Sequence, residues 1–243
     1  MQEVRILGIV GSPRKNGNTA KLVEKALEGA ISVADVKTEL YEMAGKKYHH
    51  CMACHKCKET GTCVFKDDFQ DFVRRYIEAD GIIIGAPVYH MAVPASMKAA
   101  IDRLSNSIMN NVIMRGKKMP AFNKVCGVLA VGGHPHGGQE FVLSFLINSS
   151  LLMNGVVVSG DTLLGDYIGT AAYTGLTSPE GLVQKEPAKS KNAVLNDKRA
   201  ITCAIELGKR VAQTTRIVRA GMSALERELP SEYFYTSDEF LGS

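Results

Sequence analysis

The chain alternates between short apolar runs and longer segments in which apolar residues recur at helical spacing. The short runs are rich in Val, Ile and Leu and end at Gly or polar residues, which is typical of strands. The longer segments carry apolar residues three and four positions apart, several of them behind Asn, Asp or Pro start signals. We predict strands at residues 4–10, 36–41, 82–85, 125–131 and 156–159, and helices at residues 18–31, 67–78, 94–104 and 139–153.

This alternation predicts the class of fold. Strands that alternate with helices and read as continuous apolar runs form a parallel sheet that is covered on both faces. We therefore expect an α/β fold, a doubly wound five-stranded parallel sheet in three layers, with its ligands at the carboxyl ends of the strands. A length of 243 residues suits one domain, which we place at residues 1–220, with a C-terminal extension at 221–243 that could pack on a neighbouring subunit.

Composition and charge limit the class of protein and the compartment that we expect. The chain is 45% hydrophobic and 22% charged, as in ordinary globular proteins. No apolar run approaches a membrane span and the first residues do not resemble a signal peptide, so we expect a cytoplasmic protein without a membrane partner. A net charge of +4, no Trp and few basic runs argue against binding to nucleic acid.

The loop after the first strand reads GSPRKNGNT, residues 11–19. A Gly/Ser-rich turn that enters a helix presents backbone N–H groups and the positive end of the helix dipole, which together bind anions. Ser12, Asn18 and Thr19 add side-chain donors and Arg14 adds a charge. The loop lacks the Gly-Lys-Ser/Thr of a Walker loop and the G-x-G-x-x-G dinucleotide pattern. It predicts a phosphate site.

Two more strand-end loops suit a flat ring. Residues 85–103 read GAPVYHMAVPASMKAAIDR, in which a proline stiffens the strand exit and Tyr89 and His90 offer a planar face and polar edges. Residues 131–140 read VGGHPHGGQE, in which glycines allow the backbone to approach a ligand closely. A phosphate site beside two such loops predicts a mononucleotide site.

In this order and spacing, the three loops resemble those of the NAD(P)H-dependent FMN reductase superfamily, which has the flavodoxin-like fold. The resemblance covers roughly residues 3–160. It implies that FMN carries the chemistry and that the protein orients it, so we name no catalytic side chain. It implies a phosphate site at Ser12, Arg14, Gly17, Asn18 and Thr19, a ring site at Pro87, Val88, Tyr89, His90 and Met91, and contacts near the pyrimidine end of the ring from Gly132, Gly133, Gly137, Gly138 and Gln139.

The segment HHCMACHKCKETGTC, residues 49–63, places four cysteines at the spacing C-x2-C-x2-C-x5-C. In a reducing cytosol such a cluster indicates a metal site or catalysis rather than disulfides. Zinc sites usually separate two C-x2-C pairs by a dozen or more residues, and C-x-x-C-H haem attachment would leave two cysteines unexplained. The run is closest to that of ferredoxins, and Gly61 can supply the bend before the fourth cysteine. Zinc and haem remain alternatives, whereas Cys126 and Cys203 are predicted core residues.

This cysteine run, inserted after the second strand of an FMN-binding chain, resembles the iron-sulfur flavoprotein family. The resemblance implies that Cys51, Cys54, Cys57 and Cys63 ligate a 4Fe-4S cluster on a loop at residues 43–66. It also implies homo-oligomers, dimers or tetramers, in which cluster and flavin exchange electrons across a subunit interface. All six histidines fall in the cysteine loop or the proposed flavin loops, where they could tune cofactor charge or deliver protons.

We therefore expect an FMN-dependent oxidoreductase that passes electrons between ferredoxin or NAD(P)H and a small-molecule acceptor. One alternative is an NAD(P)H-dependent FMN or quinone reductase without a functional cluster, and another is a thiol or metal sensor. Residues 160–195 are predicted to form a long loop, which could cover the flavin or meet another subunit. Residues 185–219 hold nine Lys or Arg against three Asp or Glu, and this basic face is a candidate docking site for ferredoxin.

Overall fold

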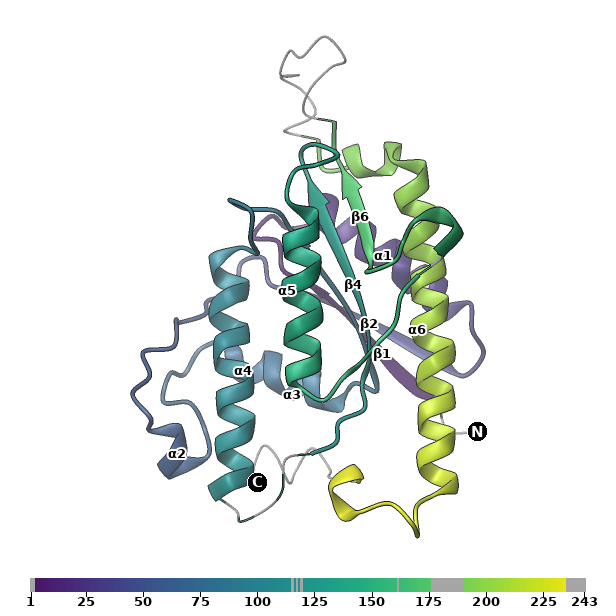
Figure 1. Ribbon diagram of the computed structural model, residues 1–243. Helices are drawn as coiled ribbons and strands as arrows, with labels where there is room; N and C mark the ends of the chain where they lie inside the picture. The colour runs from purple at the N-terminus through teal and green to yellow at the C-terminus, as the bar shows by residue number, and fades with distance from the viewer. Residues whose placement is uncertain are drawn as a thin grey trace.

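The computed structural model of the chain describes residues 3–114, 116, 118, 120–160, 162–175 and 190–234. They form one parallel sheet with helices on both faces (Figure 1). The strand order is β2-β1-β3-β4-β5, and a further strand, β6, also pairs with β4. This doubly wound order confirms the predicted fold class. Within the described part of the chain, every helix is too short or too polar to cross a lipid bilayer.

The central strands follow the apolar runs closely. Strands β1, β3 and β4 are buried along nearly their whole length, as expected for a sheet covered on both sides. Strand β2 is an edge strand; Lys37 and Glu39 are exposed, and its other residues are buried or half-buried. The strands are β1 (Val4–Val10), β2 (Val36–Glu42), β3 (Gly81–Pro87), β4 (Val125–Gly132), β5 (Val156–Val157) and β6 (Thr170–Tyr173).

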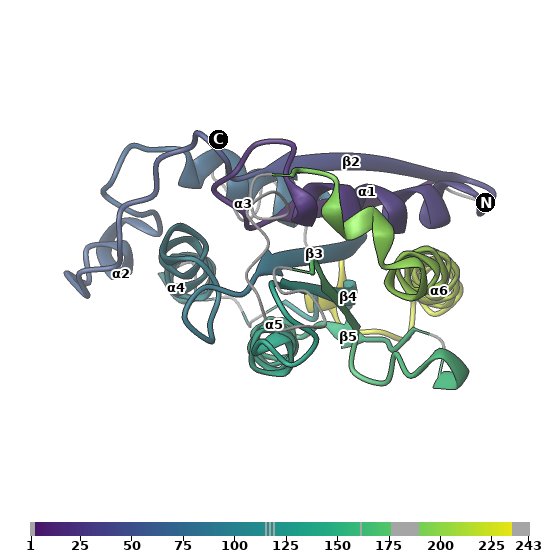
Figure 2. The ribbon, with the colours of Figure 1, turned by 90° about the horizontal axis from the view of Figure 1, so that it is seen from above.

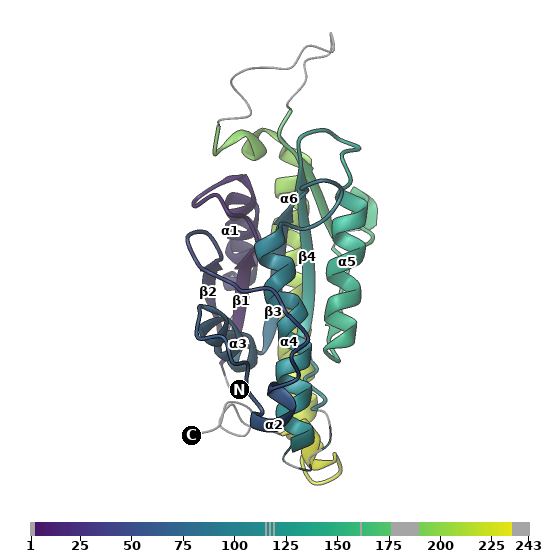
Figure 3. The same ribbon diagram turned by 90° about the vertical axis from the view of Figure 1, so that its left-hand side faces the viewer.

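The helices divide between the two faces of the sheet (Figure 2). Helices α1 and α6 share one apolar core with the sheet, and α3, α4 and α5 share the other. The short helix α2 lies beside α4 in the cysteine loop (Figures 1 and 3). The helices are α1 (Asn18–Ile31), α2 (Cys57–Thr60), α3 (Phe69–Glu78), α4 (Ala95–Met114), α5 (Gln139–Leu152) and α6 (Lys198–Ala224).

Helices α1 and α6 cross at a pair of glycines. An ideal Cβ on Gly29 would lie 2.0 Å from the Ile205 carbonyl oxygen, and one on Gly208 would lie 1.8 Å from the Ala26 carbonyl oxygen. Since neither distance is possible for a real side chain, glycine at both positions lets the two backbones touch. This contact fixes α6 against the helix that begins at the predicted phosphate loop.

The region predicted as a long loop at 160–195 is only partly a loop. Residues 170–173 form β6, which extends the edge of the sheet alongside the upper half of β4. The predicted fifth strand ends early, at Val157, and the chain leaves the sheet before it returns at Thr170. The alternation in β6 spans only four residues, which is too short to stand out in the sequence. Residues 176–189 of the predicted long loop lie outside the described residues.

The C-terminal region also differs from expectation. Helix α6 continues to Ala224, so the expected boundary at residue 220 falls inside it. Beyond it, a 3-10 turn at Ser231–Tyr233 packs on its own chain, where the Ala121 N–H donates to the Glu232 carbonyl oxygen at 3.1 Å. We predicted that the extension at 221–243 could pack on a neighbouring subunit, and its residues 235–243 lie outside the described residues.

Candidate functional site

Three loops meet at the carboxyl edge of the sheet and enclose a hollow of about 190 Å³. The Gly11 N–H donates to the Gly85 carbonyl oxygen at 2.8 Å, and the Val88 N–H donates to the Val131 carbonyl oxygen at 2.9 Å, so each loop is tied to its neighbour. Most of the predicted flavin residues line this hollow. Its walls are Ser12, Arg14, Asn18, Thr19, Pro87, Val88, Tyr89, Val131, Gly132, Gly133 and Thr174.

One end of the hollow suits a phosphate group. Helix α1 begins after Gly17, which provides no side-chain cap, and its first turn contains no acidic residue. The positive end of its dipole therefore stays uncompensated by side chains of the helix itself. The buried Ser12 Oγ accepts from the Arg14 N–H at 3.1 Å and shapes the turn in front of the helix. An anion at this position would meet helical N–H groups and the Arg14 loop.

Asn18 has a role that the sequence did not predict. Its Nδ2 donates to the Ser190 carbonyl oxygen at 2.9 Å, and its Oδ1 accepts from the Val194 N–H at 3.0 Å. The Asn18 side chain therefore links the phosphate loop to the segment in front of α6. The backbone N–H of this residue, in the first turn of α1, would also be available to a bound phosphate.

The loop after β3 makes a tight two-residue turn. Tyr89 and Ala92 exchange backbone hydrogen bonds of 2.8 and 3.0 Å, and His90 and Met91 between them have φ values of 47° and 64°. Two consecutive non-glycine residues in the left-handed region are unusual, and such strain concentrates at functional sites. The turn presents Tyr89 to the hollow, whereas His90 and Met91 do not line it.

Gln139 organises the glycine-rich loop after β4. The side chain is buried; its Oε1 accepts from the Gly137 N–H at 2.8 Å, and its Nε2 donates to the carbonyl oxygens of His134 at 2.6 Å and Ala172 at 3.2 Å. Gln139 therefore shapes the wall of the hollow from behind. An ideal Cβ on Gly138 would lie 2.9 Å from the Met91 sulfur, so these two predicted residues meet outside the hollow.

Thr174 is a wall residue that the sequence did not single out. It follows β6, and its N–H donates to the Gly132 carbonyl oxygen at 3.1 Å. The four residues of β6 before it are too few to give a signal in the sequence. The hollow as a whole combines an uncapped helix start with a wall of Pro, Val, Tyr and Gly, which fits a nucleotide that has a phosphate and a flat ring.

The cysteine run lies away from this hollow. Its short helix α2 packs beside the C-terminal half of α4 (Figures 1 and 3). All four predicted ligands are free thiols; Cys51 and Cys54 are exposed, whereas Cys57 and Cys63 are half-buried. Gly61 has a φ of 74° and ends α2, so the predicted bend before Cys63 is present. Cys126 and Cys203 are buried, as predicted.

The donor chemistry fits an iron-sulfur cluster, since four free thiols occur within one short loop. Among the described residues, however, no three His, Cys, Asp or Glu side chains come close enough together to hold a metal ion. The ligand set for the cluster therefore stays a prediction. When present, the cluster would transfer single electrons, and the four thiolates would hold it.

A buried ion pair anchors the loop that carries Cys63. The Arg103 guanidinium, 2% exposed, donates to Asp67 at 2.7 and 3.0 Å and to the His49 carbonyl oxygen at 3.1 Å. Burial alone would raise the pKa of Asp67, but the Arg103 hydrogen bonds and two backbone N–H groups lower it. Burial alone would also lower the pKa of Arg103, yet Asp67 and the nearby Cys63 raise it. Both partners are therefore held in the charged state.

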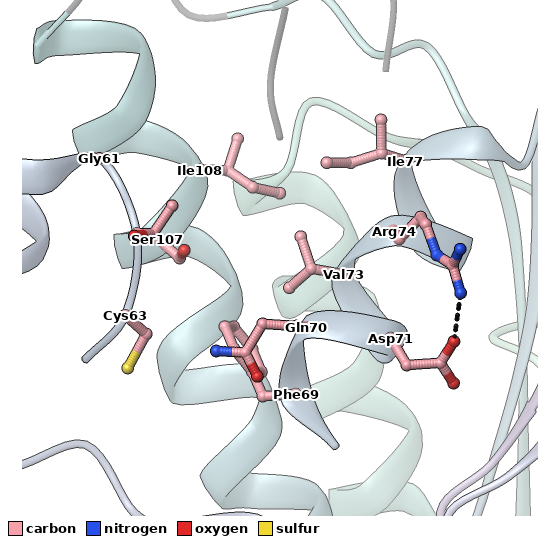
Figure 4. Close-up of a pocket in the computed structure, with 11 residues that line it drawn as sticks. Gly61, Cys63, Phe69, Gln70, Asp71, Val73, Arg74, Ile77, Ser107 and Ile108 are labelled. Carbon is pink, nitrogen blue, oxygen red and sulfur yellow. Dashed lines mark hydrogen bonds and ion pairs between the residues drawn. The ribbon is translucent and has the colours of Figure 1, made fainter. Parts of the chain in front are cut away.

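A second cavity, of about 360 Å³, lies against Cys63 (Figure 4). Apolar side chains of α3 and α4 line most of it, and Asp71 and Arg74 form an ion pair of 2.9 Å at its side. A small molecule in this cavity would contact the cysteine loop rather than the strand-end hollow. The apolar side chains are Phe69, Val73, Ile77 and Ile108.

Comparison with known proteins agrees with this geometry. Residues 4–168 match the NADPH-dependent FMN reductase family. An iron-sulfur flavoprotein of Methanocaldococcus jannaschii is 36% identical over 216 residues, which is 89% of this chain and 100% of the relative. An iron-sulfur flavoprotein of Methanosarcina thermophila is 36% identical over 158 residues, 65% of this chain and 78% of the relative.

Solved structures support the fold. A flavone reductase superposes with a TM-score of 0.62 at 18% identity, covering 89% of this chain and 64% of that protein. A flavodoxin, WrbA-like protein from Agrobacterium tumefaciens gives a TM-score of 0.54 at 19% identity, covering 89% and 99%. With the family match and the curated relatives, these findings establish that the chain belongs to the iron-sulfur flavoproteins of the NADPH-dependent FMN reductase superfamily and is an FMN-dependent oxidoreductase.

Proposed function

We propose that this protein holds FMN in the strand-end hollow and a 4Fe-4S cluster on Cys51, Cys54, Cys57 and Cys63. We further propose that it moves electrons between ferredoxin or NAD(P)H and a small acceptor. The observation that carries the proposal is the pairing, in one chain, of a phosphate-and-ring hollow with a loop of four free thiols. FMN would supply the redox chemistry, and the protein would bind, orient and shield it.

Each wall of the hollow has its own part in this function. The start of α1 and the Ser12–Arg14 turn would bind the phosphate, while Pro87, Val88 and Tyr89 would lie along the ring. The Gly132–Gly133 backbone would face the ring edge from the next strand, where glycine leaves the N–H groups accessible. Gln139 would keep that backbone in place through its bonds to the loop.

The proposal includes a homo-oligomer. Helix α4 begins directly after the flavin loop, whereas Asn110, which contacts Cys57, lies about 22 Å further along by helical rise. The cysteine loop and the hollow of one chain are thus well separated. Cys51, Cys54, Tyr89 and Met91 are all exposed, so a second copy could bring its own loop to the flavin. Sedimentation of the anaerobic protein would show a single subunit if this part is wrong.

The test of the proposed function is a cofactor count on anaerobically purified protein. We expect FMN, iron and acid-labile sulfide in each chain, and turnover with reduced ferredoxin or NAD(P)H. FMN without iron or sulfide would support the alternative of an FMN or quinone reductase. Weak flavin binding without turnover would support a thiol or metal sensor.

A further inference from the structure

Helix α4 presents polar side chains to the cysteine loop from one face. Arg103, Ser107 and Asn110 are four and three residues apart, which places them in one row along the helix. Arg103 and Asn110 are both buried, although polar side chains are seldom buried without a function or a partner. Their partners, His49, Cys57 and Asp67, lie in the loop that holds the four cysteines or directly after it.

Asn110 contacts a predicted ligand directly. Its Nδ2 donates to the Cys57 sulfur at 3.0 Å. Cys57 is the first residue of α2, so this bond also joins the short helix to α4. An amide N–H is a donor, and it is therefore matched to a sulfur that carries negative charge.

Arg103 provides the second donor. Two of its nitrogens are occupied by Asp67, and its guanidinium lies 4.1 Å from the centre of the Phe69 ring. Within the residues that the structure describes, its buried Nε has no hydrogen-bond acceptor of good geometry, while Cys63 is close enough to act on its charge. A buried donor without an acceptor is costly, so a charged sulfur at Cys63 would complete its bonding.

We propose that Arg103 and Asn110 are positioning residues that donate N–H groups to the Cys63 and Cys57 sulfurs of the cluster and raise its reduction potential. This inference rests on the proposed function. One electron added to a cluster increases its negative charge, and donors to its sulfurs favour that state. Both donors lie on α4, so this helix would raise the reduction potential of the cluster.

The test is the midpoint potential of the cluster in anaerobically reconstituted full-length protein. In Asn110→Leu, which removes the donor, we expect the reduced-to-oxidised ratio at a fixed potential to fall about tenfold, equal to about 59 mV for one electron. Asn110→Asp keeps the shape but adds an acceptor and a charge, and should lower the potential further. Arg103→Lys keeps the charge but loses the planar fork, and should also lower it.

Asn106→Leu is the matched control. Asn106 lies on the same helix, but it is exposed and donates to the Asp102 carbonyl oxygen at 3.0 Å, so its removal should leave the potential at the wild-type value. Iron, sulfide and far-ultraviolet circular dichroism, measured on each variant, show that potentials are compared on loaded and folded protein. Wild-type potentials in all three test variants would overturn the inference. A wild-type protein without iron and sulfide would instead overturn the proposed function.

Discussion

The Asp67–Arg103 pair should be the largest single electrostatic contribution to the stability of the cysteine loop. Asp67 is 8% exposed along its side chain and Arg103 is 2% exposed, so water competes little for either charge. Besides Arg103, the Asp67 carboxylate accepts from the backbone N–H groups of His49 at 2.8 Å and Phe69 at 3.2 Å. One side chain thus joins the start of the loop, the start of α3 and the middle of α4.

The substitution Asp67→Asn removes the charge and keeps the shape. One carboxylate oxygen becomes an NH2 group, which cannot accept from Arg103 or from the backbone. Removing one partner of a buried pair typically costs 3–5 kcal/mol, because the other charge stays buried without compensation. Since one acceptor oxygen remains, we expect the free energy of unfolding to fall by about 3 kcal/mol. With a urea m-value of about 3 kcal/mol/M, the midpoint would fall by about 1 M.

Asp71→Asn in α3 is the matched control. Asp71 pairs with Arg74 and Arg75 on the same helix and lies 3.7 Å from the Lys46 Nζ. Its side chain is 27% exposed, so the loss of these surface ion pairs should cost less than about 1 kcal/mol. Urea unfolding followed by far-ultraviolet circular dichroism measures both variants. If Asp67→Asn costs no more than Asp71→Asn, the pair is solvated in solution and the reasoning from burial is refuted.

The pH dependence gives an independent check of the same pair. The pKa of Asp67 is lowered in the folded state: burial, the largest single effect, would raise it, but the hydrogen bonds from Arg103 and from two backbone N–H groups together outweigh burial. A carboxyl with a lowered pKa stabilises the fold above its unfolded pKa, about 3.9, and loses this contribution as the pH falls toward the folded value. The difference between wild type and Asp67→Asn should therefore be constant from about pH 7 to pH 5 and shrink below about pH 4.

Three further predictions concern other parts of the molecule. Gly208→Ala should force α1 and α6 apart and cost about 3 kcal/mol or more in urea unfolding, whereas Gly221→Ala on the same helix, with no atom within 4 Å of its Cβ, should be neutral or stabilise by up to about 1 kcal/mol. Replacing His90 and Met91 by Asn and Gly should raise stability by about 1 kcal/mol, because this pair suits the observed turn; a lower melting temperature would contradict the assignment of strain. Cys63→Ser should lose most of its iron after anaerobic reconstitution, while Cys203→Ser, which changes a buried cysteine of α6, should keep it; equal iron contents would count against Cys63 as a ligand.

The sequence predicted the sheet well because its central strands are apolar on both faces. Strands such as 4–10 and 125–131 read as unbroken runs of Val, Ile and Leu, and they appear with nearly the same bounds. The strand-end rule then placed the three loops together without any knowledge of contacts. For this reason most of the predicted flavin residues share one hollow.

What the sequence could not predict depends on contacts between distant segments. The link from Asn18 to Ser190 and Val194 joins residues more than a hundred positions apart, and an Asn at a helix start gives no sign of it. Arg103 looked like an ordinary helix residue, since its burial arises only when the cysteine loop folds over α4. Strand β6 was hidden because four residues carry too little alternation.

The break between β5 and β6 has a consequence for assembly. A long regular edge strand offers a row of unpaired backbone groups onto which another sheet can add. Here that edge consists of two short pieces, and the chain turns out of the sheet between them. This edge is therefore poorly suited to joining the sheets of two copies, whereas the seven-residue strand β2 forms a regular edge on the opposite side of the sheet.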